Sequence, residues 1–365
     1  MRRRFFVGLI VGLGIVALGV AFRFGPAVTL SLALALPSTE GWLDRIFQES
    51  VHQEITVPVD GQTLTADLYR PTNPRSALLL VHGLSRAGRR HPELVRLARL
   101  LAQHDQLVLV PEFEGLVAFR LSGREIEEIR SALRYLGRLN ERRGIAGFSF
   151  GAGPALIAAA DVPDLRLAGS FGGYADLRHV ITYITTGVHT FGGKRYVQRQ
   201  EEYNRWKLLA LLAGFVENER DRSLLHPIAE RKLADPSDST STLEAGLSAE
   251  GQSVLALVLN RNEDAVAPFL TRLPVRAREA LDSLSPIRVV PRLSGRLLVA
   301  HGAGDDSIPF TESLRLAEAS GGQARIVILK TFHHTGPQRF WESLSQRARD
   351  GWSLFRLVDD LLTAG

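Results

Sequence analysis

Short apolar runs alternate with amphipathic helical patterns along most of the chain, and this alternation constrains the fold more than any other feature. The run Ala77–Val81 is apolar at every position, as expected for a strand that is buried on both faces. A helical pattern follows over Pro92–Gln103, and Leu107–Val110, Ser122–Asn140 and Gly144–Phe148 continue as strand, helix and strand. Such alternation predicts an α/β fold with a doubly wound, mostly parallel sheet.

Two further groups of strands extend this sheet. Residues Val51–Val59 and Thr63–Tyr69 are β-rich and flank Gly61, which predicts an antiparallel hairpin at the start of the sheet. Later in the chain the strand-like runs are Leu165–Phe171, Arg296–Ala300 and Ala324–Lys330, with a C-terminal helix from about Gln338.

A long insertion separates two of the predicted strands. About 120 residues lie between Phe171 and Arg296, far more than one connection and one helix require. The stretch is mainly helical in pattern, and its clearest helix is Tyr203–Val216. We therefore predict a helical cap over residues 176–285, inserted into a core made of residues 50–175 and 286–365. The apolar face of the cap is expected to pack against the core.

The N-terminus carries a candidate membrane helix. Phe5–Phe22 is an uncharged run of 18 residues, which reaches about 27 Å as a helix. Arginines occupy positions 2–4, whereas acidic residues dominate the other flank. The positive-inside rule then predicts an anchor over residues 1–36, with a cytoplasmic N-terminus and the remaining chain outside the cytoplasm.

Two alternatives to this topology remain open. A cleaved secretory signal would have the same basic start, and Ala33-Leu34-Ala35 offers a cleavage site for it. The second apolar stretch, Phe24–Leu36, reaches only about 20 Å and is expected to form an interfacial helix instead of a second span.

Charge and cysteine content exclude several functional classes. The formal net charge is +5, and residues 1–36 hold +4 of it, so the remaining 329 residues are nearly neutral. This removes the electrostatic argument for a nucleic-acid partner. The chain has no cysteine, which excludes disulfides, thiolate metal sites and a cysteine nucleophile.

A serine in a glycine-flanked turn is the leading candidate for chemistry. Gly147-Phe148-Ser149-Phe150-Gly151 has the form G-x-S-x-G and falls between the predicted strand Ile145–Phe148 and the small-residue helix Ala152–Ala160. A nucleophile elbow has this strand-turn-helix context, and its glycines allow a tight turn that packs closely. The sequence therefore predicts that Ser149 is a nucleophile.

A serine nucleophile needs a base and an acid that orients the base. In the elbow architecture these follow in the order acid, then histidine, each after a strand. Asp305 follows the strand that begins at Arg296, and His334 follows the strand Ala324–Lys330. Asp306 and Asp176 remain alternative acids, and His333 remains an alternative base.

These features together resemble the α/β-hydrolase family over about residues 50–365. The resemblance rests on Val81-His82-Gly83, the elbow, the spacing of His301-Gly302, Asp305 and Ile308-Pro309, and the terminal histidine. It implies that the backbone N–H groups of Leu84 and Phe150 form an oxyanion hole. We interpret His82 and His301 as structural residues.

The predicted activity follows from these assignments. We expect a membrane-anchored serine hydrolase that cleaves an ester, thioester or amide of a small-molecule or lipid-like acyl substrate through an acyl-enzyme, with no metal or organic cofactor. An acyltransferase with the same triad, or a catalytically silent, membrane-tethered binding protein, would share these features. The sequence leaves the substrate and the oligomeric state open.

Overall fold

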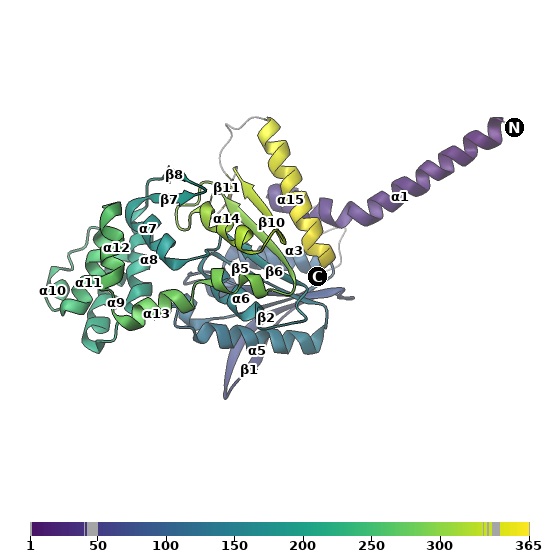
Figure 1. Cartoon of the computed structure of the whole chain (residues 1–365). Coiled ribbons are helices and arrows are strands. Elements are labelled where there is room, and N and C mark those ends of the chain that lie inside the picture. Colours follow the sequence, from purple (N-terminus) through teal and green to yellow (C-terminus); the bar gives the residue numbers. More distant parts are fainter. Residues whose placement is uncertain are drawn as a thin grey trace.

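A twisted eight-stranded sheet forms the centre of the protein (Figure 1). The structure is a computed structural model that describes residues 2–39, 41, 50–330, 332–333, 336–337 and 344–364, with side chains for residues 18–39, 41, 50–330 and 347–364.

The strand order is β1-β2-β4-β3-β5-β6-β9-β10, and the six strands from β4 to β10 are parallel. The hairpin of β1 and β2 joins this parallel part antiparallel to β4. The mostly parallel sheet and its entry hairpin agree with the prediction. The strands are β1 Val51–Val59, β2 Gln62–Arg70, β3 Ser76–Val81, β4 Gln106–Pro111, β5 Arg143–Phe148, β6 Leu167–Phe171, β9 Arg296–Gly302 and β10 Ala324–Leu329.

Helices cover both faces of the sheet, which explains the continuous apolar strands. In β3, Leu78 and Leu80 face one buried cluster, whereas Leu79 and Val81 face the other. Successive side chains of a strand point to opposite faces, so a strand between two helical layers must be apolar throughout. The helices α3 (Pro92–Gln103) and α15 (Leu344–Ala364) lie on the first side, and α5 (Arg124–Leu139), α6 (Ala152–Ala159) and α14 (Phe310–Ala319) lie on the second.

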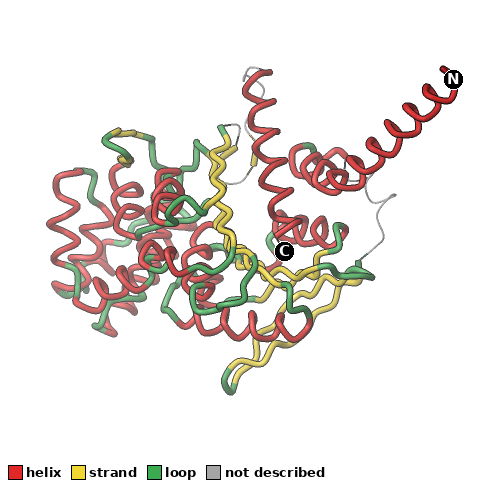
Figure 2. The backbone as a smooth tube through the Cα atoms, turned by 45° about the vertical axis from the view of Figure 1, so that its right-hand side comes forward, coloured by secondary structure: helices red, strands yellow, loops and turns green. Residues whose placement is uncertain are grey.

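The stretch between β6 and β9, residues 176–285, is hereafter the inserted segment. It is mainly helical, as predicted, and in both views its helices gather beyond one end of the sheet (Figure 1, Figure 2). The apolar side chains of α8 are buried there, including Trp206 and Leu209. The elements are α7 Leu177–Thr186, β7 Val188–Phe191, β8 Lys194–Val197, α8 Glu202–Ala213, α9 Glu219–Ala234, α10 Ser241–Glu244, α11 Ala249–Leu259, α12 Glu263–Arg272 and α13 Val275–Ser283.

Some short elements were not predicted. The hairpin β7–β8 turns at Gly192 and Gly193, which both have positive φ. A Gly-Gly pair between β-rich residues is a hairpin signal, so this turn was readable from the sequence. The other short elements are α4 Glu114–Val117, β11 Phe332–His333 and β12 Gly336–Pro337. The predicted start of the C-terminal helix at Gln338 lies outside the described residues.

The N-terminal helix α1 runs from Arg2 to Ala35 without a break. Its first part projects from the body, at the end of the molecule away from the inserted segment (Figure 1, Figure 2). Among the residues whose side chains the structure describes, Leu18–Ala35 is the stretch of helix long and apolar enough to cross a membrane, and 17% of it is buried. The predicted span Phe5–Phe22 lies mostly before this stretch, in the part of α1 of which only the backbone is described.

The stretch Phe24–Leu36, for which the sequence predicts an interfacial helix, is helical as far as Ala35, and its position relative to a membrane stays a prediction. This stretch continues α1 as far as Ala35 and packs on α3 and α15, where Ala27, Leu30 and Ala33 are buried. An ion pair of 2.5 Å between Arg23 and Asp359 of α15 marks the beginning of the contact. Small residues on one helical face allow α1 to approach the body closely, which the periodicity of a uniformly apolar stretch does not reveal.

Candidate active site

Ser149 has a left-handed backbone conformation, with φ of +51°. It follows the end of β5 at Phe148 and opens a short 3-10 turn, Ser149–Gly151, that leads into α6 at Ala152. Residues other than glycine rarely adopt positive φ, because the Cβ atom then approaches the backbone, and such strain concentrates at functional sites. The turn therefore has the strained strand-to-helix form that presents a side chain above the edge of a sheet.

The glycines on either side of Ser149 are required by close backbone packing. A Cβ atom at Gly147 would lie 2.5 Å from the Cα atom of Ala152. At Gly151 it would lie 2.1 Å from the carbonyl oxygen of His82. Both distances are far below van der Waals contact, so this turn can form only with glycine at the two positions.

The turn after β3 lies directly against the serine. A Cβ atom at Gly83 would lie 2.9 Å from the Cβ atom of Ser149 and 3.4 Å from its Oγ atom. Leu84 follows Gly83, and Phe150 follows Ser149, so the chain segments that carry both predicted amide donors meet at this point. The two segments come from neighbouring parallel strands, because β3 pairs with β5.

His82 holds this turn in place. Its Nε2 atom accepts a hydrogen bond of 3.1 Å from the backbone N–H of Phe113, so Nδ1 carries the proton and donates to the carbonyl oxygen of Gly83 at 2.9 Å. Burial lowers the pKa of His82, which favours this neutral form. Both ring nitrogens are thus engaged with the backbone, in agreement with a structural role.

Asp305 lies on the loop after β9 and is 2% exposed. Its Oδ1 atom accepts hydrogen bonds from the backbone N–H groups of Ser307 and Ile308, at 2.8 and 2.9 Å. Its Oδ2 atom lies 3.4 Å from Nε2 of His301. Backbone donors stabilise the charged form of a carboxyl group and fix its orientation. This is the environment that a buried orienting acid requires.

His301 is engaged elsewhere. Its Nδ1 atom lies 2.6 Å from the hydroxyl oxygen of Ser313, and its Nε2 atom lies 2.9 Å from the carbonyl oxygen of Ile308. The side chain is fully buried. His301 therefore connects the loop after β9 to α14, as a structural residue does.

The loop after β6 lies between the turn that carries Ser149 and the loop after β9 that carries Asp305. A Cβ atom at Gly172 would lie 3.5 Å from Oδ2 of Asp305, and one at Gly173 would lie 3.7 Å from the carbonyl oxygen of Ser149. Gly172 therefore lies beside Asp305, and the adjacent Gly173 lies beside Ser149. The strand order explains this proximity, because β6 lies between β5 and β9 in a parallel sheet, whose carboxyl ends meet at one edge.

The alternative acids are placed differently. Asp176 caps α7, since its Oδ1 atom accepts from the backbone N–H of Arg178 at 2.8 Å. Asp306 adjoins Asp305 and its Oδ1 atom lies 3.4 Å from the hydroxyl of Ser307. The predicted base His334 lies outside the described residues. The backbone of His333 forms part of β11, but its side chain lies outside the description.

The loop after β9, residues 303–309, carries Asp305 and is hereafter called the acid loop. Several polar side chains that no sequence motif indicated surround it. Tyr183, Gln198 and Asn204 of the inserted segment all donate hydrogen bonds to it. Lys207 lies nearby, and burial lowers the pKa of its ammonium group, whereas the charges of Asp306 and Asp305 oppose this shift. No motif marks such residues, because they are single polar positions in helices and loops. Among the described residues, no cluster of three or more His, Asp or Glu side chains is suited to hold a metal ion.

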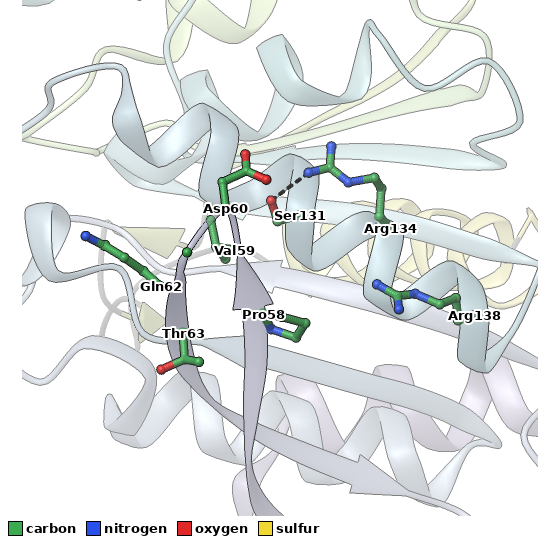
Figure 3. A pocket seen from close by; sticks show the side chains of 9 residues that line it. Pro58, Val59, Asp60, Gln62, Thr63, Ser131, Arg134 and Arg138 are labelled. Carbon is green, nitrogen blue, oxygen red and sulfur yellow. Dashed lines mark hydrogen bonds between the residues drawn. The ribbon is translucent and has the colours of Figure 1, made fainter.

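A cavity of about 520 Å³ lies apart from these residues (Figure 3). It forms where the turn of the β1–β2 hairpin meets α5, and Arg134 and Arg138 of that helix line it with Asp60 of the turn. Arg134 donates a hydrogen bond of 2.8 Å to the hydroxyl of Ser131 (Figure 3). None of the residues that line this cavity is a candidate site residue.

The chain has an α/β-hydrolase-like fold, defined by the mostly parallel central sheet and the helices on its two faces, and one N-terminal apolar helix is a candidate membrane span. No protein-family model matches the chain, and no curated protein matches it in sequence.

Among solved structures, the chain is similar to the α/β hydrolase GrgF from Penicillium sp. sh18, with a TM-score of 0.49, 16% identity and coverage of 84% of this chain and 98% of that one. It is also similar to Est1E from Butyrivibrio proteoclasticus, with a TM-score of 0.46, 11% identity and coverage of 84% and 98%. The acylaminoacyl peptidase of Pyrococcus horikoshii gives a TM-score of 0.48 and 14% identity over 87% of this chain. The chain spans only 41% of the length of that peptidase.

Proposed function

We propose that this protein is a serine hydrolase that cleaves a carboxylic ester, thioester or amide with Ser149 as nucleophile, Asp305 as acid and His334 as base. One observation carries the proposal: Ser149 holds a positive φ between β5 and α6, and the turn after β3 is pressed against it. A serine held at positive φ costs conformational energy and adds little to the stability of the fold. A catalytic role for Ser149 best explains why this energy is spent.

The reaction would proceed in two halves. The Oγ atom of Ser149 attacks the carbonyl carbon of the substrate while its proton passes to the imidazole of His334. The bond to the leaving group then breaks, and the leaving group takes that proton. In the second half, water attacks the acyl-enzyme, gives a proton to the imidazole and releases the acid, with the proton returned to Ser149.

The buried Asp305 carboxylate suits the third role of a triad. It would accept a hydrogen bond from the imidazole with Oδ2, because two backbone amides already occupy Oδ1. A carboxylate in this position fixes the tautomer of the base and stabilises the imidazolium. The backbone amides of Leu84 and Phe150 would stabilise the negative oxygen of the tetrahedral intermediate, and losing one such donor typically costs about 3–4 kcal/mol in the transition state.

Labelling with a fluorophosphonate probe tests the nucleophile directly. Such probes phosphonylate an activated serine, so we expect the wild type to react and Ser149→Ala to remain unlabelled. Ser237→Ala is the matched control, because Ser237 is an exposed serine in the inserted segment and its loss should leave labelling unchanged. A wild-type protein that does not react, or labelling that survives in Ser149→Ala, would refute the proposed function.

We further propose that α1 anchors the protein in a membrane through Phe5–Phe22, with the N-terminus in the cytoplasm and the body outside it. The later half of α1 is unsuited to lie in hydrocarbon, because Arg23 pairs with Asp359 and Thr29 hydrogen-bonds to His104 at 2.9 Å. Membrane fractionation of the full chain and of a variant lacking residues 1–22 tests this proposal. Recovery of both proteins in the soluble fraction would exclude an anchor.

A further inference from the structure

Side chains of the inserted segment hold four consecutive residues of the loop that carries Asp305. The hydroxyl of Tyr183 donates a hydrogen bond of 2.6 Å to the carbonyl oxygen of Asp305 itself. Gln198 donates from Nε2 to the carbonyl oxygen of Gly304, the preceding residue, at 3.1 Å. The loop is therefore bound from outside at the acid and directly before it.

Asn204 completes the contact on the other side of the acid. Its Nδ2 atom donates to the carbonyl oxygen of Asp306 at 2.9 Å, and its Oδ1 atom accepts from the hydroxyl of Ser307, also at 2.9 Å. Asn204 is 3% exposed. One amide group thus satisfies two neighbouring residues, with both its donor and its acceptor used in a buried position.

The bond of Tyr183 to Asp305 and the bond of Ser307 to Asn204 are buried, whereas the bonds to Gly304 and Asp306 are partly buried. Tyr183 is fully buried, and burial raises the pKa of its hydroxyl, which therefore remains a donor. Hydrogen bonds in a region of low dielectric are stronger than in water, and a buried group that loses its partner is costly. The geometry of the loop is consequently fixed relative to the inserted segment.

Two layers of hydrogen bonds surround the Asp305 carboxylate. The inner layer consists of the backbone amides of Ser307 and Ile308, which hold Oδ1. The outer layer consists of the side chains of Tyr183, Gln198 and Asn204, which hold the backbone of the same loop. The inner donors can hold the carboxylate only as accurately as the loop itself is held, so the outer layer contributes to where the carboxylate points.

We propose that Tyr183 and Asn204 are positioning residues for the Asp305 carboxylate, so that the inserted segment forms part of the catalytic machinery and does not only cover the site. This inference rests on the proposed function, because it requires Asp305 to be the acid of the triad. It adds that a residue of α7 and a residue of α8 set the geometry of that acid.

Replacing Tyr183 by phenylalanine removes one hydroxyl and retains the ring. A displacement of the order of 1 Å at a catalytic group can reduce turnover about 100-fold, so we expect Tyr183→Phe to lower kcat by about 10- to 100-fold with KM changed less than about twofold. Tyr174→Phe is the matched control. Tyr174 is equally buried, but its hydroxyl donates to the carbonyl oxygen of Leu284 at 3.0 Å, outside the acid loop.

Asn204→Ala provides a second variant on another helix. It should also lower kcat with little change in KM. A double-mutant cycle then separates positioning from general loosening of the fold. In a protein that already carries Asp305→Asn, adding Tyr183→Phe or Asn204→Ala should reduce kcat less than about twofold further, because an asparagine no longer stabilises the imidazolium whatever its position.

The outcomes distinguish this inference from the proposed function. If the wild type lacks hydrolase activity and does not react with fluorophosphonate, the proposed function fails. If the wild type is active and Asp305→Asn is not, but Tyr183→Phe reduces kcat no more than Tyr174→Phe, the positioning role is overturned and the function stands. Full additivity of Tyr183→Phe with Asp305→Asn would also overturn it.

Discussion

The carbonyl oxygen of His82 lies 2.1 Å from the point that a Cβ atom at Gly151 would occupy. The two residues belong to different turns, one after β3 and one after β5, and their backbones approach because these strands are parallel neighbours. His82 in turn holds Gly83, which borders Ser149. A side chain at Gly151 would therefore disturb both the serine and the turn that is expected to supply an oxyanion donor.

Gly151→Ala should destabilise the protein and inactivate it. The atoms that a Cβ would meet are backbone atoms, which cannot rotate away, so we expect a loss of about 1–3 kcal/mol or more in the free energy of unfolding. Chemical denaturation measures this change. Gly351→Ala is the control, because Gly351 lies exposed in α15 with open space around it and should gain up to about 1 kcal/mol. Equal stability of the two variants would contradict the packing argument.

Asp305→Asn should reduce kcat by about 10⁴-fold while the protein remains folded, as neutralising a triad acid does. The neighbouring variant Asp306→Asn should retain kcat within about threefold, because the amides of Ser307 and Ile308 hold Asp305 and not Asp306. Steady-state kinetics with p-nitrophenyl esters of increasing chain length measures both variants. A larger effect of Asp306→Asn would transfer the acid role to that residue.

Two N-terminal truncations should behave differently. Removing residues 1–22 leaves the packed half of α1 in place and should preserve thermal stability in mild detergent. Removing residues 1–36 also deletes Ala27, Leu30 and Ala33, which are buried, and their loss should cost roughly 3 kcal/mol. It also removes the carbonyl oxygen of Ala33, which accepts a hydrogen bond of 2.6 Å from Arg96. Thermal denaturation compares the two, and equal Tm values would show that this half of α1 adds no stability.

His189 should make the protein less stable in mild acid. Burial lowers its pKa to about 4 from 6.5, while Glu312 opposes this shift. Between these values the unfolded chain binds the proton more readily than the folded one, so the contribution of His189 is complete above about pH 6.5 and is lost as the pH falls toward 4. Urea denaturation at pH 7 and pH 5 should show a smaller decrease for His189→Gln than for the wild type. An equal decrease in both would assign the acid sensitivity to other groups.

Local patterns predicted the elements of the fold closely. The helix expected over Pro92–Gln103 has those same bounds, and the continuous apolar run Ala77–Val81 forms the strand β3 with one residue added. The position of the serine turn was also predictable, because the strand, the glycines and the small-residue helix are adjacent in the chain. Periodicity and turn chemistry depend on residues only a few positions apart, so the sequence reports them directly.

Long-range contacts were not predictable in this way. The spacing after His301-Gly302 favoured Asp305 over Asp306, but the two backbone amides directed at Oδ1 of Asp305 could not be foreseen from it. The packing of the later half of α1 on α3 and α15 depends on which of its small residues face the body, and uniform hydrophobicity hides that face.

By itself, the sequence determined which segments form strands and helices, where the sheet is interrupted by an insertion and which serine occupies a strained turn, since each of these follows from neighbouring residues. The tertiary structure decided how side chains of the inserted segment form hydrogen bonds with the acid loop. Tyr183 contacts Asp305 across 122 positions of the chain and Asn204 contacts Asp306 across 102, and such contacts arise only when separately formed elements dock against one another.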